Sequence, residues 1–445
     1  MVDELKESAQ RLLKTLLKKG ADDAIVHAQS ARLKQVKFAN NKIAKAACDN
    51  SSSASVFVAK DGRTASTSLK RFDVKSIEET AQKLLRFTSS LQPNPSYEGI
   101  AEGPFKYVGI ARGFDSRVNA LEENGVDVVE SAINTALAQG AERVAGVLEW
   151  GVHEEFLATS RSVSASQKGT SLYFSLRAIA GEGSGHKVTA SRTLSFFDCN
   201  KAAGQAGELA SWSRKPVACK AGEYDVVFDA LPFSCLLDTV GSSASIFSAE
   251  AGFSFLAGKL GKRVASPALT LYDDATLENG FNSTSFDDEG TPSQLNLLIK
   301  DGLLRTFLHN HSTAKRYKTR STASAGLVSP QAWNLRVKPG RHSFDELLSE
   351  TRNGLYLSNL WYTRFQNYAS GDFSTIPRDA AFLIKNGELM QPVKGMRVTE
   401  NMLGLLQRIK ALGRTCTQIK GWEVDTPCIA PSALIEKVRI TRPTS

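Results

Sequence analysis

Residues 24–62 read AIVHAQSARLKQVKFANNKIAKAACDNSSSASVFVAKDG, and this stretch decides the fold class. It contains short runs of β-prone side chains, separated by the turn-forming pairs Asn40-Asn41 and Asp61-Gly62. Runs of this kind, joined by pairs that adopt tight turns, are typical of antiparallel strands. We therefore expect a meander of short strands over residues 24–28, 33–39, 43–46 and 54–59.

Patterns typical of helices lie on both sides of this strand block. Leucines recur at helical spacing over residues 3–19. Apolar residues do so again over 77–85, where Ser76 and Glu79 are placed as a capping box. A third helix is predicted over 126–139. Because helices and strands occur in blocks and do not alternate strictly, we predict an α+β fold.

The pattern returns to strands after the third helix. We expect strands over 144–150 and 155–159, followed by a hairpin of 161–166 with 171–179 around Lys168-Gly169. The next glycines, in Gly183-Ser184-Gly185-His186, superficially resemble a nucleophile elbow, but the Gly-x-Ser-x-Gly pattern is absent. We interpret them as a flexible hairpin loop.

Two domains are expected, because a chain of 445 residues exceeds the length at which a single hydrophobic core keeps growing. An N-terminal α+β domain of antiparallel strands and helices is predicted over residues 1–215, with subregions of about 1–95 and 110–215. A strand-rich α+β domain is predicted over 220–445.

The C-terminal domain is expected to open with a buried strand over 224–228. Within it, Asp301-Gly302 and Asn386-Gly387 each separate two β-prone runs. Both pairs are strong signals for two-residue hairpin turns.

Composition argues against several classes of protein. Hydrophobic residues make up 42% of the chain and charged residues 23%, which is the ordinary globular balance. No run approaches the ~20 apolar residues of a membrane span, and the first residues lack the pattern of a secretory signal. We therefore expect a cytoplasmic protein without a membrane anchor. The net charge of +9 is spread over a long chain, so it does not favour nucleic-acid binding.

The cysteines and histidines do not form a recognisable metal motif. No CxxC pair occurs, and reduced thiols are the expectation. A helical zinc hydrolase needs two histidines at one metal and a glutamate beside them, but no two histidines here have the required spacing. His153-Glu154 begins such a motif by chance. His309 and His311 would share one face of a strand, and we interpret them as surface or packed histidines.

Two segments have an unusual density of specific side chains. Asp287, Asp288 and Glu289 precede a Gly-Thr-Pro turn, either as a solvated loop or as acids that orient neighbouring groups in a cleft. Residues 360–368 combine aromatic rings with a guanidinium, which suits core packing, an extended peptide or a subunit interface.

At these segments the chain resembles the TldD/PmbA family, formerly called modulators of DNA gyrase, across nearly its whole length. The resemblance is carried by several separate stretches of sequence. They are Gly222-Glu223-Tyr224-Asp225-Val226-Val227, residues 286–292 with Asp301-Gly302, residues 381–387, and Pro392-Val393-Lys394-Gly395.

The resemblance implies a specific place for zinc in relatives of the TldD type. There a helix bears His-Glu-x-x-x-His, which with a downstream cysteine binds zinc for peptide hydrolysis. The matching helix here, after Pro232, has Leu237, Asp238 and Ser242 at those places. Leucine cannot ligate zinc, and aspartate with serine is a weak ligand pair for it.

The downstream ligand is also missing from its expected place. Residues 421–423 lack the family's Gly-x-Cys-Gly-Lys pattern, while Cys416 and Cys428 lie near it but out of register. The roles of these two cysteines stay open.

The chain is therefore similar to the PmbA kind of member, also called TldE. That kind implies a heterodimer with a TldD-type subunit that carries the zinc, with peptide as substrate and no catalytic residue or cofactor in this chain. We expect a peptide groove or interface to include Asp287, Asp288, Glu289, Trp361, Tyr362 and Arg364.

Two other functions stay open on the sequence. One is a homodimeric peptidase with a divergent site, including a metal held by Asp238 and a cysteine. The other is a regulatory nucleic-acid or toxin-associated binding protein.

Overall fold

Residues 24–62 form one long hairpin and not the predicted meander of short strands. In the computed structural model, which describes residues 2–122 and 124–442, β1 spans Asp23–Ala39 and β2 spans Lys42–Lys60. The two strands pair along their whole length, through the polar residues 49–53. The prediction was wrong because pairing with a long partner keeps residues of low strand propensity extended.

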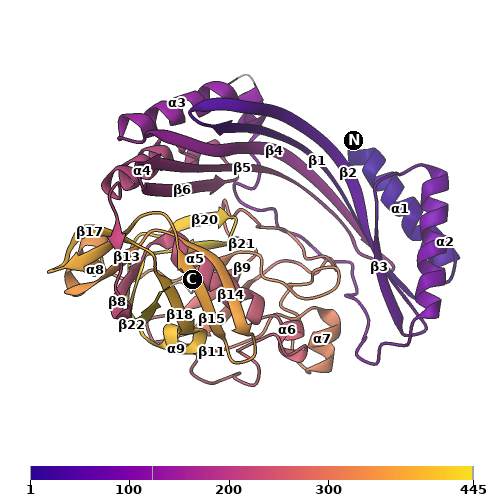
Figure 1. Cartoon of the computed structure of the whole chain (residues 1–445). Coiled ribbons are helices and arrows are strands. Elements are labelled where there is room, and N and C mark those ends of the chain that lie inside the picture. Colours follow the sequence, from indigo (N-terminus) through magenta and orange to yellow (C-terminus); the bar gives the residue numbers. More distant parts are fainter. Residues whose placement is uncertain (1, 123, 443–445) are drawn as a thin grey trace.

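The two strands belong to a six-stranded antiparallel sheet that arches over the C-terminal part of the chain (Figure 1). Its strand order is β3-β2-β1-β4-β5-β6. The central pair, β1 with β4, is in continuous register from Ile25 opposite Thr159 to Ala39 opposite Ala145. The remaining strands are β3 (Arg63–Leu69), β4 (Arg143–Thr159), β5 (Ser164–Ala180) and β6 (Gly183–Ser191).

Three further predictions in this sheet are wrong. The residues predicted as separate strands at 144–150 and 155–159 form the single strand β4, and the β4–β5 turn falls at 160–163. Lys168-Gly169 therefore lies inside β5, where a Cβ on Gly169 would overlap Arg192 and His153. Glycine is needed at this position because neighbouring side chains approach the backbone closely, and not because the chain turns there. Gly183 to His186 likewise form the start of β6 and not a loop.

Helices cover the two ends of the sheet. α1 (Val2–Lys18) and α2 (Val74–Ser90) pack on one end, and α3 (Gly125–Ala138) and α4 (Cys199–Trp212) on the other (Figure 1). The positions of α1, α2 and α3 agree with the predictions, whereas α4 was not predicted and the predicted capping box of α2 is wrong. Asp73 caps this helix, since its carboxylate accepts hydrogen bonds from the backbone N–H and the hydroxyl of Ser76.

The two halves of the sheet repeat one order of elements. α1-β1-β2-β3-α2 is followed by α3-β4-β5-β6-α4, and the strand order is symmetric about the β1–β4 pair. Gly20 and Gly140 follow the first helix of each half, both with φ of 93°. Only glycine adopts this backbone conformation without strain, so the same helix stop is used twice.

The C-terminal part contains two further sheets around a common core. The ten-stranded sheet consists of β14 (Leu360–Asn367), β15 (Asp372–Pro377), β18 (Arg397–Asn401), β22 (Ala433–Thr441), β8 (Gly222–Phe228), β13 (Asn353–Leu357), β16 (Ala381–Lys385), β17 (Glu388–Lys394) and β7 (Val217–Ala218), with β19 (Ile409–Leu412) paired to β22. The six-stranded sheet consists of β11 (Leu303–Leu304), β10 (Leu295–Lys300), β9 (Leu271–Asp274), β12 (Leu335–Val337), β21 (Val424–Ala430) and β20 (Thr417–Gly421). The described chain is thus an α+β protein, as predicted.

The helix α5 (Ala230–Ser243) lies in the middle of this part, against β21 and β8. Asp229 caps it, and nearly every residue of its first three turns is buried. The shorter helices are α6 (Ile246–Glu250), α7 (His311–Arg316), α8 (Phe344–Glu350), α9 (Met402–Gln407) and the 3-10 turns Ser116–Glu122 and Leu194–Phe196. No helix among the described residues is long and apolar enough to cross a membrane.

Both hairpin turns predicted in the C-terminal part are confirmed. Asp301-Gly302 joins β10 to β11, and Asn386-Gly387 joins β16 to β17. All four residues have positive φ, as a type I′ turn requires.

A buried carboxylate, that of Asp379, ties the first sheet to the C-terminal part. It accepts hydrogen bonds from Arg177 Nε at 2.9 Å, Ser184 Oγ at 2.8 Å and Asn359 Nδ2 at 2.7 Å. Burial alone would raise the pKa of Asp379, but the charge of Arg177 and the hydrogen bonds from Arg177 and Asn359 act together against it, and the pKa is lowered. The sheet and the C-terminal part therefore meet through a charged, fully hydrogen-bonded contact.

Substitution Asp379→Ala should lower the free energy of unfolding by about 3 to 5 kcal/mol, because it leaves Arg177 partly buried without its counter-charge. Urea unfolding followed by circular dichroism measures this. The matched control is Glu79→Ala, which removes the exposed pair with Lys83 on α2 and should barely move the midpoint. Equal shifts for the two variants would contradict this role for Asp379.

Candidate functional site

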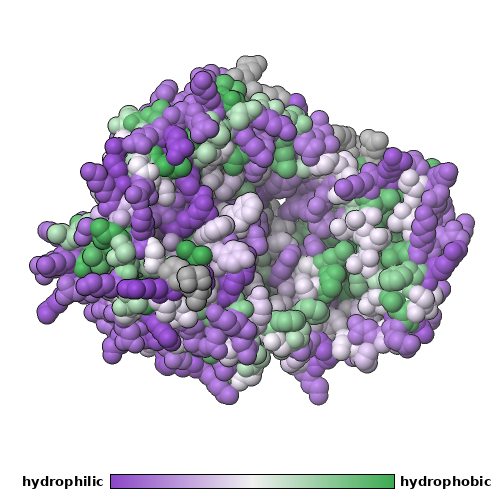
Figure 2. Space-filling view, in the orientation of Figure 1, coloured by the Kyte–Doolittle hydropathy of each residue, from purple (hydrophilic) through white to green (hydrophobic). Residues whose placement is uncertain are grey.

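Adjacent cavities that share lining residues extend from the space between the arched sheet and the C-terminal part into the C-terminal part itself. The space-filling view is hollowed in the middle of its visible face, between these two parts (Figure 2). Three cavities are large: the Trp361 cavity of about 680 Å³, the Asp238 cavity of about 630 Å³ and the Arg192 cavity of about 560 Å³. A smaller cavity of about 330 Å³ connects the last two, sharing Ser242 with one and Trp333 with the other.

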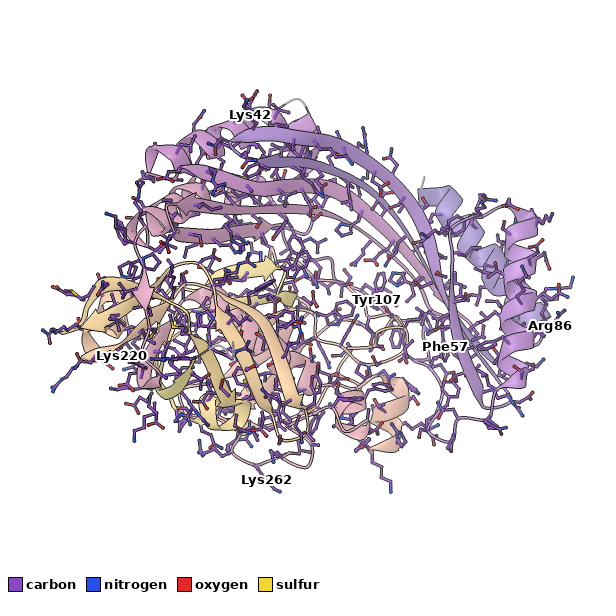
Figure 3. The ribbon with its side chains drawn as sticks, in the orientation of Figure 1. Lys42, Phe57, Arg86, Tyr107, Lys220 and Lys262 are labelled. Atoms are coloured by element: carbon purple, nitrogen blue, oxygen red, sulfur yellow. The ribbon has the colours of Figure 1, made fainter. Side chains whose placement is uncertain are left out.

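The crossover after α2 also runs through this region. Figure 3 shows Tyr107 between the sheet and the C-terminal part. Its hydroxyl donates to the carbonyl of Gly290 at 2.8 Å, and its ring meets Phe286 edge-on. This crossover is thus packed against the C-terminal part.

The three positions that match the zinc motif do not gather around one point. Leu237 is 0% exposed in the C-terminal core. Asp238 and Ser242 line the Asp238 cavity. The two oxygens of Asp238 accept the backbone N–H groups of Thr426 at 2.9 Å and Asp425 at 3.2 Å.

These residues do not fit a zinc ion. Leu237 has no donor atom, both oxygens of Asp238 are already hydrogen-bonded, and Ser242 donates to the carbonyl of Asp238 at 3.1 Å. Among the described residues, no group of three or more His, Cys, Asp or Glu side chains is arranged to hold a metal.

The nearby cysteines are thiols in an apolar setting. Cys235 lines the Trp361 and Asp238 cavities, and Cys428 is buried beside it with Sγ 3.3 Å from the carbonyl of Thr426. Burial raises the pKa of both thiols, with Asp238 adding to the effect. Cys416 is only partly buried, near the carbonyl of Val337, and its pKa is also raised by burial. The protonated form of each is therefore favoured, which weakens it as a metal ligand.

The acidic loop of residues 287–289 is buried, so the solvated-loop alternative is wrong. Asp287 accepts hydrogen bonds from the backbone N–H groups of Glu289, Thr291 and Ala325. Burial raises the pKa of Asp287 to about 7 in spite of these bonds. Glu289 accepts the N–H of His311 at 3.0 Å, and burial, followed by the charge of Asp287, raises its pKa as well.

The middle acid of the loop, Asp288, faces the Arg192 cavity. It pairs with Nδ1 of His27 at 3.1 Å, and Nε2 of the same ring pairs with Glu155 at 2.6 Å. Burial would lower the pKa of His27, but its hydrogen bonds to Asp288 and Glu155 raise it to about 10. The ring is therefore an imidazolium, held between a carboxylate of the sheet and one of the loop.

A second buried cation lies in the same cavity. Arg192, directly after β6, donates to the carbonyls of Thr170 and Ser283 and to Nε2 of His153 at 3.2 Å. Burial lowers the pKa of Arg192 to about 10. Burial and the neighbouring guanidinium lower the pKa of His153 to about 4, so this imidazole is neutral.

The aromatic segment forms β14, which is the edge strand of the ten-stranded sheet. Trp361 lines the Trp361 cavity under the guanidinium of Arg378, 4.3 Å from its ring centre. Arg364 stacks on Tyr362 at 4.0 Å and lines the Asp238 cavity. Tyr362 is 48% exposed and lines none of these cavities. Leu360 is buried in the core and Phe365 packs against it, whereas Trp361, Tyr362 and Arg364 are exposed. These three residues do not share a cavity with Asp288.

Sequence reasoning missed the charged cluster of His27, Glu155 and Arg192. Strand alternation places His153 and Glu155 on one face of β4, but their partners are distant in sequence: Arg192 lies 39 residues after His153, and His27 lies 128 residues before Glu155. His309 and His311 do not share a strand, since His309 is buried before α7 and His311 is its first residue. Asn310 caps that helix, and this local capping pattern outcompeted the extended conformation.

The charge on His27 should make part of the stability depend on pH. Because its folded pKa of about 10 lies above the unfolded value of about 6.5, the contribution is complete below pH 6.5 and is lost as the pH rises through 10. The stability difference between wild type and His27→Gln should therefore shrink by roughly 2 to 5 kcal/mol between pH 6.5 and pH 10.5.

Urea unfolding at the two pH values measures this difference. The control is His342→Gln, which removes an exposed pair with Glu350 and should cost less than about 1 kcal/mol at either pH. A His27 difference that stays constant, or grows, with pH would mean that the ring is not held as a cation.

Comparison with known proteins agrees with this architecture. The model of the PmbA/TldA metallopeptidase central domain matches residues 110–214, and that of the C-terminal domain matches residues 221–442. The metalloprotease MJ0996 of Methanocaldococcus jannaschii is 33% identical over 208 residues, covering 44% of this chain and 45% of that protein. A metalloprotease TldD homolog of Haemophilus influenzae is 32% identical over 200 residues, covering 43% and 41%. The aligned part thus spans about half the length of these relatives or less.

Solved structures match the whole fold. TldE from Thermococcus kodakarensis superimposes with a TM-score of 0.86 at 21% identity, over 98% of this chain and 100% of that one. A protein of Thermotoga maritima described as a modulator of a DNA gyrase also gives 0.86, at 23% identity over 98% and 99%. Identities this low show a shared fold only. Because the two family models together match well over half of its length, the chain belongs to the PmbA/TldD metallopeptidase family.

Proposed function

We propose that this chain is the TldE-like subunit of a TldD/TldE-type heterodimeric metallopeptidase. In this role it binds no metal itself, and its cavities form part of the chamber that holds the peptide. A TldD-type partner supplies the zinc and the hydrolytic chemistry. Family membership supports the general role, and the fold shared with a TldE protein fits the assignment to this kind of member.

The observation that carries the proposal is the set of side chains on α5, the helix that matches the zinc-binding helix of TldD-type relatives. α5 lies in the core, where Leu237, which matches the first ligand position of the motif, has no donor atom and Asp238 accepts hydrogen bonds from the β21 backbone. Removing a ligand from a zinc site while keeping the helix that carried it preserves the fold and the cavity wall. Those are the parts a non-metal-binding subunit needs.

The residues around the cavities are suited to holding an extended chain. The Trp361 cavity combines aromatic walls from Trp361 and Trp422 with the charges of Arg378 and Glu423. Aromatic surfaces beside fixed charges bind peptide side chains of mixed character at low entropic cost. The connected cavities extend this surface from β14 around α5 to the middle of the first sheet.

Co-expression with a TldD-type chain from the same organism should give a 1:1 complex that hydrolyses unstructured peptides. Elemental analysis should find about one zinc per heterodimer, and none in this chain purified alone. A partner whose histidine motif is changed to alanines serves as the control and should give an inactive complex. Stoichiometric metal and peptidase activity in this chain alone would overturn the proposal in favour of a homodimeric peptidase.

Within such a complex, Trp361→Ala should raise KM for peptide hydrolysis about fivefold or more and change kcat much less, because the ring contributes binding and no chemistry. Steady-state kinetics with a quenched fluorescent peptide measures both constants. Trp212→Ala is the matched control, since this tryptophan on α4 is 56% exposed and lies outside the cavities. Parallel changes in the two variants would argue against Trp361 as part of a peptide groove.

A further inference from the structure

Arg192 is a buried cation that makes no salt bridge with the described residues, although the charge of Glu155 acts on it from a distance. Its side chain is 3% exposed, and no salt bridge within residues 2–122 and 124–442 includes it. Of the five N–H groups of a guanidinium, three have acceptors here: the carbonyls of Thr170 and Ser283, and the ring of His153. A buried charge of this kind is costly unless an anion completes it.

The three acids that line the Arg192 cavity, Glu154, Glu155 and Asp288, each pair with another cation. Glu154 pairs with Lys168. Glu155 pairs with His27 and accepts a hydrogen bond from Gln167, and Asp288 pairs with the other nitrogen of His27. Both carboxylates are therefore paired with the imidazolium of His27. The remaining N–H groups of Arg192 have no acidic partner in the described chain.

His153 adds a second donor beside the guanidinium. Arginine only donates, so the contact with Nε2 makes this nitrogen an acceptor and places the ring proton on Nδ1. Gly169 makes room for the pair, because a Cβ there would overlap both Arg192 and His153. Both side chains line the Arg192 cavity, with hydroxyls of Ser53 and Ser171 and the ring of Trp333 around them.

We propose that Arg192 and His153 form a carboxylate-binding site in the Arg192 cavity, and that the carboxylate belongs to a peptide. Either a free C-terminus or an acidic side chain supplies the same chemistry. Guanidinium binds carboxylate through two parallel N–H donors, and a neutral imidazole N–H supplies a further donor. A cavity of about 560 Å³ has the size of a typical small-ligand site. That the ligand is a peptide rests on the function proposed above, whereas the carboxylate site does not.

Calorimetric titration of the purified full-length chain tests the site. The probes are N-acetyl-trialanine with a free C-terminus, its C-terminal amide, and an amidated N-acetyl peptide with a central glutamate. At least one of the two carboxylate probes should bind ten times more tightly than the uncharged amide, and the stronger one identifies the source. Equal affinity of all three, or no binding of any up to 10 mM, would overturn the inference.

Variants test whether the carboxylate probe binds in this cavity. Arg192→Gln and Gly169→Ala should each weaken the preferred probe at least tenfold. Arg161→Gln is the matched control, because this arginine has Asp23 as its counter-ion and lies outside the Arg192 cavity, and it should bind normally. Unchanged affinity in Arg192→Gln would place the carboxylate elsewhere and refute the site. The comparison of acid and amide in wild type stands even if a variant does not fold.

The result is separable from the proposed function. If the chain alone binds the carboxylate probe but forms no complex with any TldD-type partner, only the proposed subunit role is refuted. An active complex in which the acid and amide probes bind alike would remove only this site.

Discussion

The continuous antiparallel pairing of β1 with β4 is the interaction on which the rest of the structure depends. It joins two halves that each fold as helix, three strands and helix, and it makes one sheet from them. Each strand is 17 residues long, so the sheet twists and curves far enough to cover the C-terminal part. Without this pairing the concave wall of the cavities would not exist.

The pairing also determines which charged side chains meet on the concave side of the sheet. It brings His27 of β1 beside Glu155 of β4, and the loop carrying Asp288 closes on the same ring. His27 stays charged because it contacts two carboxylates, which raise its pKa in spite of burial, whereas Asp287, buried without a cation, has its pKa raised by burial. Arg192 differs from His27, because the groups that accept its hydrogen bonds are two backbone carbonyls and the neutral ring of His153.

The elements predicted correctly share a local cause. The helices over 3–19 and 126–139 follow from apolar spacing, and the turns at Asp301-Gly302 and Asn386-Gly387 follow from the positive φ that such pairs tolerate. The errors share a non-local cause. Lys168-Gly169 has turn chemistry, but it lies inside β5 because pairing with Glu154 and His153 of β4 holds it extended. The site residues of the zinc-motif helix could be located in sequence, but not the binding of Asp238 to β21.

The amino-acid sequence by itself determined the helix positions, the tight turns and the chemical type of the side chains on α5, including an aliphatic residue at Leu237. Those properties depend on neighbours a few positions apart. Only the tertiary structure decided which acids are buried, that His27 is a cation, and that Arg192 and His153 share one cavity. These outcomes depend on groups separated by tens to hundreds of residues, whose contacts follow from strand pairing and burial and leave no periodic trace in the chain.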